Sequence, residues 1–224
     1  MSGRRRPQEV GATTSPELDL AELEAVVVDA LESRFELERV RLDGAELAGA
    51  EAGSGRIEQA LLSGVQLDGA RLRGVRMVDV RAERLGAANG DWSSGSLSQV
   101  EIVGSRLTGL DLGAAHLSQV RFRECKLDYA NFRHATLADV SFEDCVLAAA
   151  DFQGADLRSV RFDGCELRGA DFTRAELERV DLRGSTIELG GSLLGLRGAI
   201  IDSLQLMDLS RGIAHELGIS VEER

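Results

Sequence analysis

The sequence predicts an all-β solenoid in which the chain winds as a square coil, and two periods in the residue pattern support this prediction. A five-residue unit repeats without a phase slip from Val40 to Leu189, which makes 30 consecutive units. Single residue types also recur in every fourth unit. A period of five fits neither an α-helix, which repeats every 3.6 residues, nor a strand, which repeats every two. We therefore expect one unit on each of four sides, and four units in each turn.

Each unit has one large and one small apolar position. The third residue is a large apolar residue in nearly every unit, and the first is small or β-branched in nearly every unit. We expect both side chains to point into the coil. Leu85 precedes the small Ala87, and Gly90 precedes the large Trp92, which is the volume exchange that a close-packed interior requires. Residues 48–54 carry small residues at both positions, so we expect a bulge, a loop or a thin turn there.

Identical side chains are expected to stack in columns along the coil, because neighbouring turns of a parallel β-ladder lie ~4.8 Å apart. A valine column is formed by Val80, Val100, Val120, Val140, Val160 and Val180. The structural core is predicted to hold two phenylalanine columns and one cysteine column: Phe122, Phe142 and Phe162; Phe132, Phe152 and Phe172; Cys125, Cys145 and Cys165.

The segments before the repeat are assigned separately. Residues 1–15 are rich in Arg, Ser, Gly and Thr, and we expect them to be disordered. Residues 16–39 are predicted to be an N-terminal cap, because a solenoid must cover its first open edge. Their secondary structure stays open, since Ser15-Pro16 is typical of a helix start whereas the β-branched run at 26–28 favours a strand. Residues 40–189 form the repeat domain.

Residues 190–224 are predicted to form a C-terminal strand and a helical cap. Leu196–Ile201 is the expected last strand. Asp202, with Gln205 three residues later, has the arrangement of a capping box, so a helix is expected to begin there. This helix would cover the last turn, and its apolar stripe is a candidate contact with a second copy of the chain. The residues assigned to this cap or dimer contact are Leu204, Met207, Ile213 and Leu217.

Composition and charge argue against several classes of protein. The formal net charge of −12 argues against direct binding of nucleic acid. The three cysteines are an odd number with no apolar signal region expected ahead of them, so we predict a cytoplasmic protein without a disulfide framework. No run of residues approaches the ~18 apolar residues of a membrane span, so no membrane partner is expected.

An acidic column is the candidate partner surface. It consists of Asp91, Asp111, Asp151 and Asp171, and Asn131 completes it. One interpretation is a stripe of negative charge that imitates a row of phosphates. The other is that these short side chains bond to the backbone at each corner, as Asx residues commonly do in turns. The arginines interspersed along the rod favour the second interpretation.

The sequence contains no constellation that predicts catalysis, a cofactor or a metal site. The cysteines occupy an inward position where Ala and Val stand in other units, and a buried thiol behaves as a small apolar side chain. The histidines are isolated from one another and from any metal-binding or catalytic motif. We therefore expect no catalytic residue, no cofactor and no metal.

The units ADFQG, ADLRS, ADFTR and VDLRG resemble the A-[DN]-[LF]-x-x unit of the pentapeptide-repeat proteins, and the resemblance covers roughly Val40–Leu189. It implies a right-handed quadrilateral β-helix. The tail LRGAIIDSLQLMDL is similar to C-terminal segments of bacterial members, some of which dimerise through that end. The quinolone-resistance members of the family are acidic dimers that imitate duplex DNA and bind DNA gyrase.

From these observations we expect a non-enzymatic scaffold that mediates protein–protein interaction. The alternative, implied by the resemblance, is a DNA-mimicking homodimer that binds DNA gyrase and modulates quinolone sensitivity. Residues 40–189 carry 24 acidic and 18 basic residues, a net charge of only −6. A DNA imitator needs a continuous negative field, so this mixed charge weakens the alternative.

Overall fold

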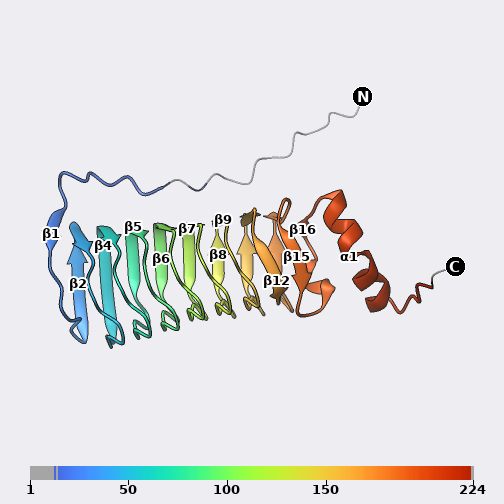
Figure 1. Cartoon of the computed structure of the whole chain (residues 1–224), viewed down its shortest axis with the longest axis horizontal. Helices are drawn as coiled ribbons and strands as arrows, with labels where there is room; N and C mark the ends of the chain where they lie inside the picture. The colour runs from blue at the N-terminus through green and yellow to red at the C-terminus, as the bar shows by residue number, and fades with distance from the viewer. Residues whose placement is uncertain (1–12, 14, 223–224) are drawn as a thin grey trace, which may run out of the picture.

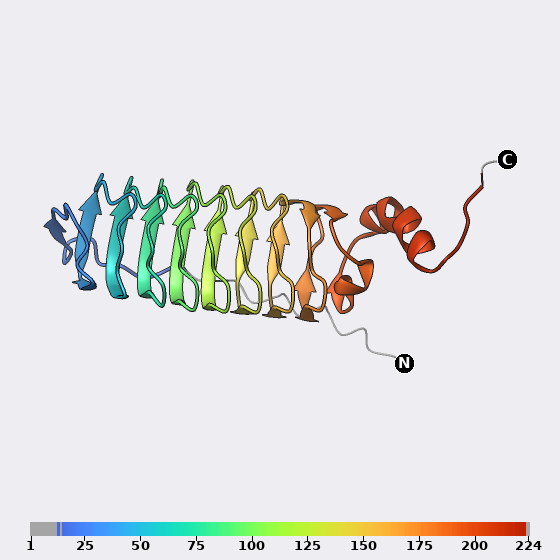
Figure 2. The same cartoon turned by 90° about the horizontal axis from the view of Figure 1, so that it is seen from below.

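The computed structural model describes residue 13 and residues 15–222 and shows a parallel β-solenoid of about nine turns with one C-terminal helix. The turns stack along a straight rod, and the helix lies at its C-terminal end (Figure 1). The view turned by 90° shows the same regular stack from below (Figure 2). The solenoid predicted from the two periods is therefore confirmed.

The strands are short because each turns a corner after a few residues. In chain order they are β1 (Glu24–Val26), β2 (Arg34–Glu38), β3 (Val40–Asp43), β4 (Ser54–Ser63), β5 (Arg76–Glu83), β6 (Ser96–Val103), β7 (His116–Arg123), β8 (Thr136–Ala138), β9 (Ser141–Glu143), β10 (Asp156–Arg158), β11 (Arg161–Asp163), β12 (Glu166–Ala170), β13 (Glu176–Glu178), β14 (Val180–Asp181), β15 (Thr186–Leu189) and β16 (Ala199–Ile200). A 3-10 helix, η1 (Leu193–Leu196), precedes β16, and α1 (Ser203–Glu216) follows it.

The register of the ladder gives the length of one turn. Val80 pairs with Val100, and Val100 pairs with Val120, in parallel strands. Most neighbouring strands keep this interval of four units, as predicted. The ends differ: Glu24 pairs with Val40, and Val180 pairs with Ala199. The first and last turns are therefore shorter than the repeating ones.

The corners have a common backbone conformation. The last residue of each five-residue unit has a positive φ, from Arg39 (51°) through to Gly184 (79°), and Ser54 is the exception. Gly adopts the left-handed region without strain, and other residues adopt it only as single positions. The solenoid meets this condition because each side has one such residue. At Ser54 the chain instead runs straight into β4. The irregularity predicted for residues 48–54 is thus one missing corner conformation, while Glu51 still pairs with Arg71.

The core fills the inside of the rod. Phe122 and Phe142 stack with ring centroids 5.0 Å apart, and Phe142 and Phe162 with centroids 4.8 Å apart. The second column, Phe132, Phe152 and Phe172, stacks at 4.7 and 4.8 Å, and the two columns meet edge to face. These six rings are fully buried. Stacked and edge-to-face rings add roughly 0.5–1.5 kcal/mol per pair beyond the burial of their area.

The N-terminal segment contains strands and no helix between residues 15 and 39. β2 pairs with β4 at the full interval of four units, so the five-residue phase begins one unit earlier than Val40, at Phe35. The ring of Phe35 fills the space that a side chain at Gly55 would take. The strand alternative for this segment is therefore what the structure shows, and the glycine makes room for the first aromatic ring.

The C-terminal cap begins as predicted and packs differently from the prediction. The Asp202 carboxylate accepts hydrogen bonds from the N–H groups of Leu204 (2.9 Å) and Gln205 (3.0 Å), and the Asp202 N–H donates to Gln205 Oε1 (2.8 Å), which is a capping box. The expected strand over 196–201 is reduced to β16. On α1, Leu209 and Gln205 are buried against the rod. The apolar stripe of the helix was predicted to cover the last turn. This prediction is wrong for Leu204, Met207 and Leu217, which are exposed (71%, 70% and 68%).

Gln205 closes the open end of the solenoid. Its Nε2 donates to the carbonyl oxygens of Leu182 (2.6 Å) and Ser185 (2.7 Å). These carbonyls lie at the end of the stack, and an unpaired buried carbonyl costs about as much as a lost hydrogen bond. A polar residue is therefore better suited than an apolar one to the buried face of this helix.

Candidate functional site: the outer faces and the C-terminal pocket

The acidic column lies on one outer face, and its side chains bond to the corners. Asp111 Oδ1 accepts the N–H of Gly113 at 2.8 Å and the side-chain amide of Asn131 at 2.8 Å. The same bond to the N–H two residues later is made by Asp91 (3.0 Å), Asp151 (2.9 Å) and Asp171 (2.8 Å). Each carboxylate thus has the geometry of an Asx turn. The observed role of these four side chains is therefore to stabilise corners of the coil.

Hydrogen bonding lowers the pKa of two of these carboxyls. Burial raises the pKa of Asp91, but the hydroxyl and backbone N–H of Ser93, together with the charges of Arg73 and Arg71, lower it overall. For Asp171, burial again raises the pKa, and hydrogen bonds from Thr173 and Gln153, together with the charge of Arg133, lower it overall. Both groups therefore remain charged at neutral pH, because hydrogen bonds to a carboxylate favour its ionised form.

The charge of the rod is spread evenly over its four sides. We name each side by the central residue of one of its units: the Phe142, Leu147, Phe152 and Leu157 faces, each comprising that unit and every fourth unit before and after it between Val40 and Leu189. The Phe142 face carries seven basic and eight acidic residues, the Leu147 face three and five, the Phe152 face four and five, and the Leu157 face four and six. The net charge of each face is thus −1 or −2. The acidic column, on the Phe152 face, is preceded by Arg71, which pairs with Asp91, and is accompanied by Arg133, which contacts Asp151 at 2.6 Å.

The cysteine column is buried in the core, and hydrogen bonding between neighbouring thiols lowers the pKa of Cys125 and raises the pKa values of Cys145 and Cys165. Cys125, Cys145 and Cys165 are free thiols, and each is 1% exposed. The hydrogen bond with Cys125, together with burial, raises the pKa of Cys145 to about 12. A thiol in this state is not a nucleophile at neutral pH, since the thiolate is the reactive form. Among residue 13 and residues 15–222, no group of three or more His, Cys, Asp or Glu side chains is placed to hold a metal ion.

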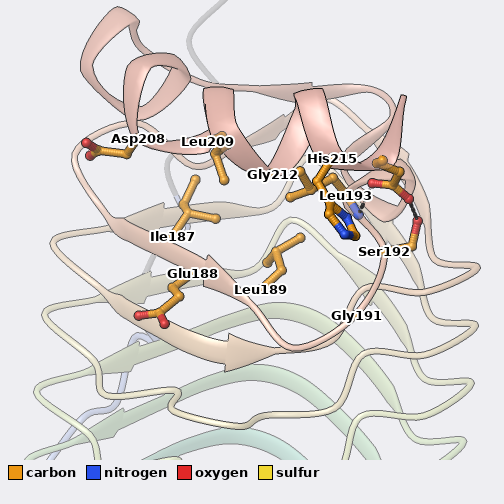
Figure 3. Close-up of a pocket in the computed structure, with 11 residues that line it drawn as sticks. Ile187, Glu188, Leu189, Gly191, Ser192, Leu193, Asp208, Leu209, Gly212 and His215 are labelled. Atoms are coloured by element: carbon orange, nitrogen blue, oxygen red, sulfur yellow. Dashed lines mark hydrogen bonds between the residues drawn. The ribbon is translucent and has the colours of Figure 1, made fainter. Parts of the chain in front are cut away.

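A pocket of about 620 Å³ lies between the last turn and α1 (Figure 3). Its apolar lining comes from both sides, with Ile187 and Leu189 on β15 and Leu209 on α1, and the acidic residues Glu188, Asp208 and Glu216 also line it. Glu216 accepts hydrogen bonds from the Ser192 hydroxyl and from the N–H of Leu193, which ties the end of α1 to the loop after β15. The full lining is Ile187, Glu188, Leu189, Gly191, Ser192, Leu193, Asp208, Leu209, Gly212, His215 and Glu216.

Apolar side chains are exposed mainly at this same end of the molecule. Leu204, Leu206, Met207 and Leu217 on and beside α1 are each more than half exposed, and Ile219 and Val221 follow. Of the four residues assigned to the cap or dimer contact, Ile213 lies half-buried against the core and the other three point away from it. The molecule thus presents an apolar end and polar sides.

One buried polar cluster on the Phe142 face was missed by sequence reasoning. Glu101 and Ser141 occupy outward positions of their units, yet they are only 3% and 5% exposed. Thr13 and Ser15 cover them and bond to Arg121 and Glu101. Disorder was predicted for residues 1–15, and this prediction is wrong for Thr13 and Ser15, which make the contacts given above. Residues 1–12 and 14 lie outside the described residues. The unit pattern carries no signal for this contact.

Comparisons with known proteins agree with the fold. Residues 115–189 match a family model described as the pentapeptide repeat region. The chain is similar to a trypsin-treated form of QnrB1, a plasmid-mediated fluoroquinolone resistance protein, with 20% identity and a TM-score of 0.52 over 89% of this chain and 98% of that chain. It is also similar to a pentapeptide repeat protein of the Arabidopsis thaliana thylakoid lumen, with 26% identity and a TM-score of 0.41 over 48% of this chain and 76% of that one.

No curated protein matches the sequence. No helix in the described part of the chain is long and apolar enough to span a membrane.

Proposed function

We propose that the chain, part of which matches the pentapeptide repeat region, is a non-enzymatic pentapeptide-repeat scaffold that binds a protein partner through its outer faces or its C-terminal end. The proposal is supported by the separation of polar and apolar side chains on the surface. The sides of the rod carry ion pairs and Asx turns, such as Arg133–Asp151 and Asp111–Gly113, whereas exposed apolar side chains lie mainly on α1 and beside it. Fixed polar sides and an apolar end suit specific docking of a protein.

A photo-crosslinking scan tests this proposal. A photoreactive residue would be placed in turn at an exposed site on each face and at Leu204 on α1, in the cell from which the chain comes. We expect one defined partner to crosslink from one face or from the end, and the crosslink to disappear when a charge on that face is reversed. A specific turnover of a substrate that a single substitution abolishes would instead show an enzyme.

A second candidate is the DNA-mimicking homodimer that acts on DNA gyrase. It is supported by the net charge of −12 and by the likeness in fold to QnrB1 along nearly the whole chain. The similar net charge of the four faces, −1 or −2 each, argues against this candidate, because a protein that imitates DNA needs a continuous negatively charged surface. A gyrase supercoiling assay with and without a fluoroquinolone tests it. Unchanged supercoiling and unchanged drug sensitivity would rule it out.

We further propose that the scaffold is a cytoplasmic homodimer joined through its C-terminal ends. Free, buried thiols suit a reducing compartment. The exposed apolar residues of α1 and the tail after it supply a surface that a second copy would cover.

A further inference from the structure

A short N-terminal segment crosses the outside of the rod and binds to side chains far away in the sequence. Arg121 donates from Nη2 to the carbonyl oxygen of Thr13 and from Nη1 to the Ser15 hydroxyl oxygen (3.2 Å). The Ser15 hydroxyl donates to Glu101 Oε1 (3.0 Å), and the Thr13 hydroxyl lies 3.4 Å from the Asp139 carbonyl oxygen. The described part of the segment runs from β1 back along the side of the stack (Figure 1). We call the described residues Thr13, Ser15 and Pro16 the strap.

The strap covers charged groups, whereas the equivalent position two turns later is open to water. Glu101 is 3% exposed under the strap, and the Arg121 side chain is 22% exposed. Two turns later, Arg161 is free of the strap and its side chain is 53% exposed. Desolvation of a charged pair is costly, and the attraction between the charges offsets this cost only when the remaining hydrogen bonds are made.

Those remaining hydrogen bonds are incomplete. Within residues 13 and 15–222, Glu101 Oε2 and Arg121 Nε are buried and have no hydrogen-bond partner. Arg81 Nη1 lies 3.4 Å from that Glu101 oxygen, and Glu143 Oε1 lies 3.4 Å from Arg121 Nε, in ion pairs without hydrogen-bond geometry. The strap thus occupies a site whose polar groups it satisfies only in part, so an occupant that supplied one more donor to Glu101 would be held more firmly.

We propose that the surface around Glu101 and Arg121 on the Phe142 face is a docking surface for an extended peptide segment, and that the strap occupies it until a partner's segment displaces it. The fitting segment presents a carbonyl oxygen to Arg121, as Thr13 does, and a Ser or Thr hydroxyl to Glu101, as Ser15 does, together with an N–H donor for Glu101 Oε2. This rests on the proposed scaffold function and names its surface. The occupant in the free protein is the chain's own strap.

Cysteine labelling tests whether the strap is seated. Thr13 is 4% exposed, whereas Leu20 in the same segment is 61% exposed. We expect maleimide to modify a Thr13→Cys protein at least about tenfold more slowly than a Leu20→Cys protein, which corresponds to about 1.4 kcal/mol of closure. Adding Arg121→Gln or Ser15→Asp should remove the difference, and the matched control Arg161→Gln should leave it unchanged. Equal rates in the two starting proteins would overturn the proposal.

A peptide-binding measurement tests whether the surface around Glu101 and Arg121 binds a separate peptide. A fluorescent synthetic peptide with the sequence of residues 11–20 would be added to the full-length chain. We expect it to bind the Ser15→Asp protein, in which two carboxylates meet and the strap is released, at least about tenfold more tightly than the wild type, whose strap competes intramolecularly. Combining Ser15→Asp with Arg121→Gln should abolish binding.

The two readouts separate this inference from the wider scaffold proposal. If labelling shows a seated strap but the Ser15→Asp protein binds no peptide, the docking surface is refuted, while a scaffold that acts through another face or through α1 still stands. If the peptide binds as predicted and no protein partner is found, the scaffold proposal and displacement by a partner both fail, and only the binding of the chain's own segment at Glu101 and Arg121 is supported.

Discussion

Phe142 lies at the middle of the interior and contacts rings above, below and beside it. Its centroid is 5.0 Å from Phe122, 4.8 Å from Phe162 and 5.9 Å from Phe132. Because turns on both sides fix its neighbours, the space it leaves cannot collapse. We expect Phe142→Ala to lower the free energy of unfolding by about 3–5 kcal/mol, which is the usual range for a buried ring. Urea denaturation followed by circular dichroism measures this change.

The control for this variant is Tyr129→Ala. Tyr129 is 70% exposed, so its removal should change the free energy of unfolding by less than about 0.5 kcal/mol. A loss below about 1 kcal/mol for Phe142→Ala would contradict the packed interior.

Asp181 illustrates how a single carboxyl links stability to pH. A bidentate contact with Arg183, at 2.6 and 2.8 Å, lowers the pKa of Asp181 in the folded state, and burial opposes this. Its stabilising contribution is therefore complete above the unfolded pKa of roughly 3.9 and is lost as the pH falls through the lower folded value. Since the Arg183 side chain is 54% exposed, solvent limits the pair to about 1 kcal/mol.

We expect Asp181→Asn to be less stable than the wild type at pH 7 and to approach it as the pH falls through the folded pKa of Asp181. Denaturation curves collected between neutral and strongly acidic pH measure the difference. A gap between the two proteins that stays constant over this whole pH range would show that Asp181 acts by something other than its charge.

At the scale of elements, α1 depends on one polar residue at its start. Asp202 satisfies two N–H groups of the first turn, and the positive end of the helix dipole favours its charge. We expect Asp202→Ala to destabilise α1, because two N–H groups of its first turn lose their acceptor. Hydrogen exchange of the α1 amides should rise more than that of β5–β7, since the cap acts locally.

Asp208 provides the matched comparison within the same helix. It lines the pocket and makes no contact with the first turn among the bonds of the described residues. Asp208→Ala should therefore leave α1 exchange nearly unchanged. Equal effects of the two substitutions would argue against the capping role.

At the scale of the whole molecule, the surface places its apolar side chains at one end. The double variant Leu204→Glu, Met207→Glu puts two charges where side chains that are 71% and 70% exposed would meet a second copy. Each lost buried contact costs about 1.5–3 kcal/mol, so the dimer dissociation constant should rise by roughly a hundredfold or more. Sedimentation velocity at several concentrations measures it.

Val27→Glu is the control at the opposite end of the rod, where the side chain is 88% exposed. It should leave the sedimentation behaviour unchanged. If the wild type itself sediments as a monomer at every concentration, the C-terminal dimer is refuted.

Much of the fold was predictable because it repeats. One unit specifies one large inward residue, one small inward residue and one corner, and the interval of four units brings identical residues such as Val80 and Val100 into register. The start of α1 was predictable for a similar reason, since Asp202 and Gln205 interact within a single turn of helix. The acidic column was also placed correctly on one face, and its Asx geometry follows from local backbone bonds.

The periodic features therefore follow from the order of the residues: the coil, its register, its interior columns and the helix start all depend on short distances along the chain. The contacts between segments outside the repeat became known only from the folded molecule. It seated Ser15 on Glu101, 86 residues away, and turned Gln205 and Leu209 rather than Leu204 and Met207 toward the last turn. Such contacts have no period, because each depends on where a unique segment meets a surface after the solenoid has closed.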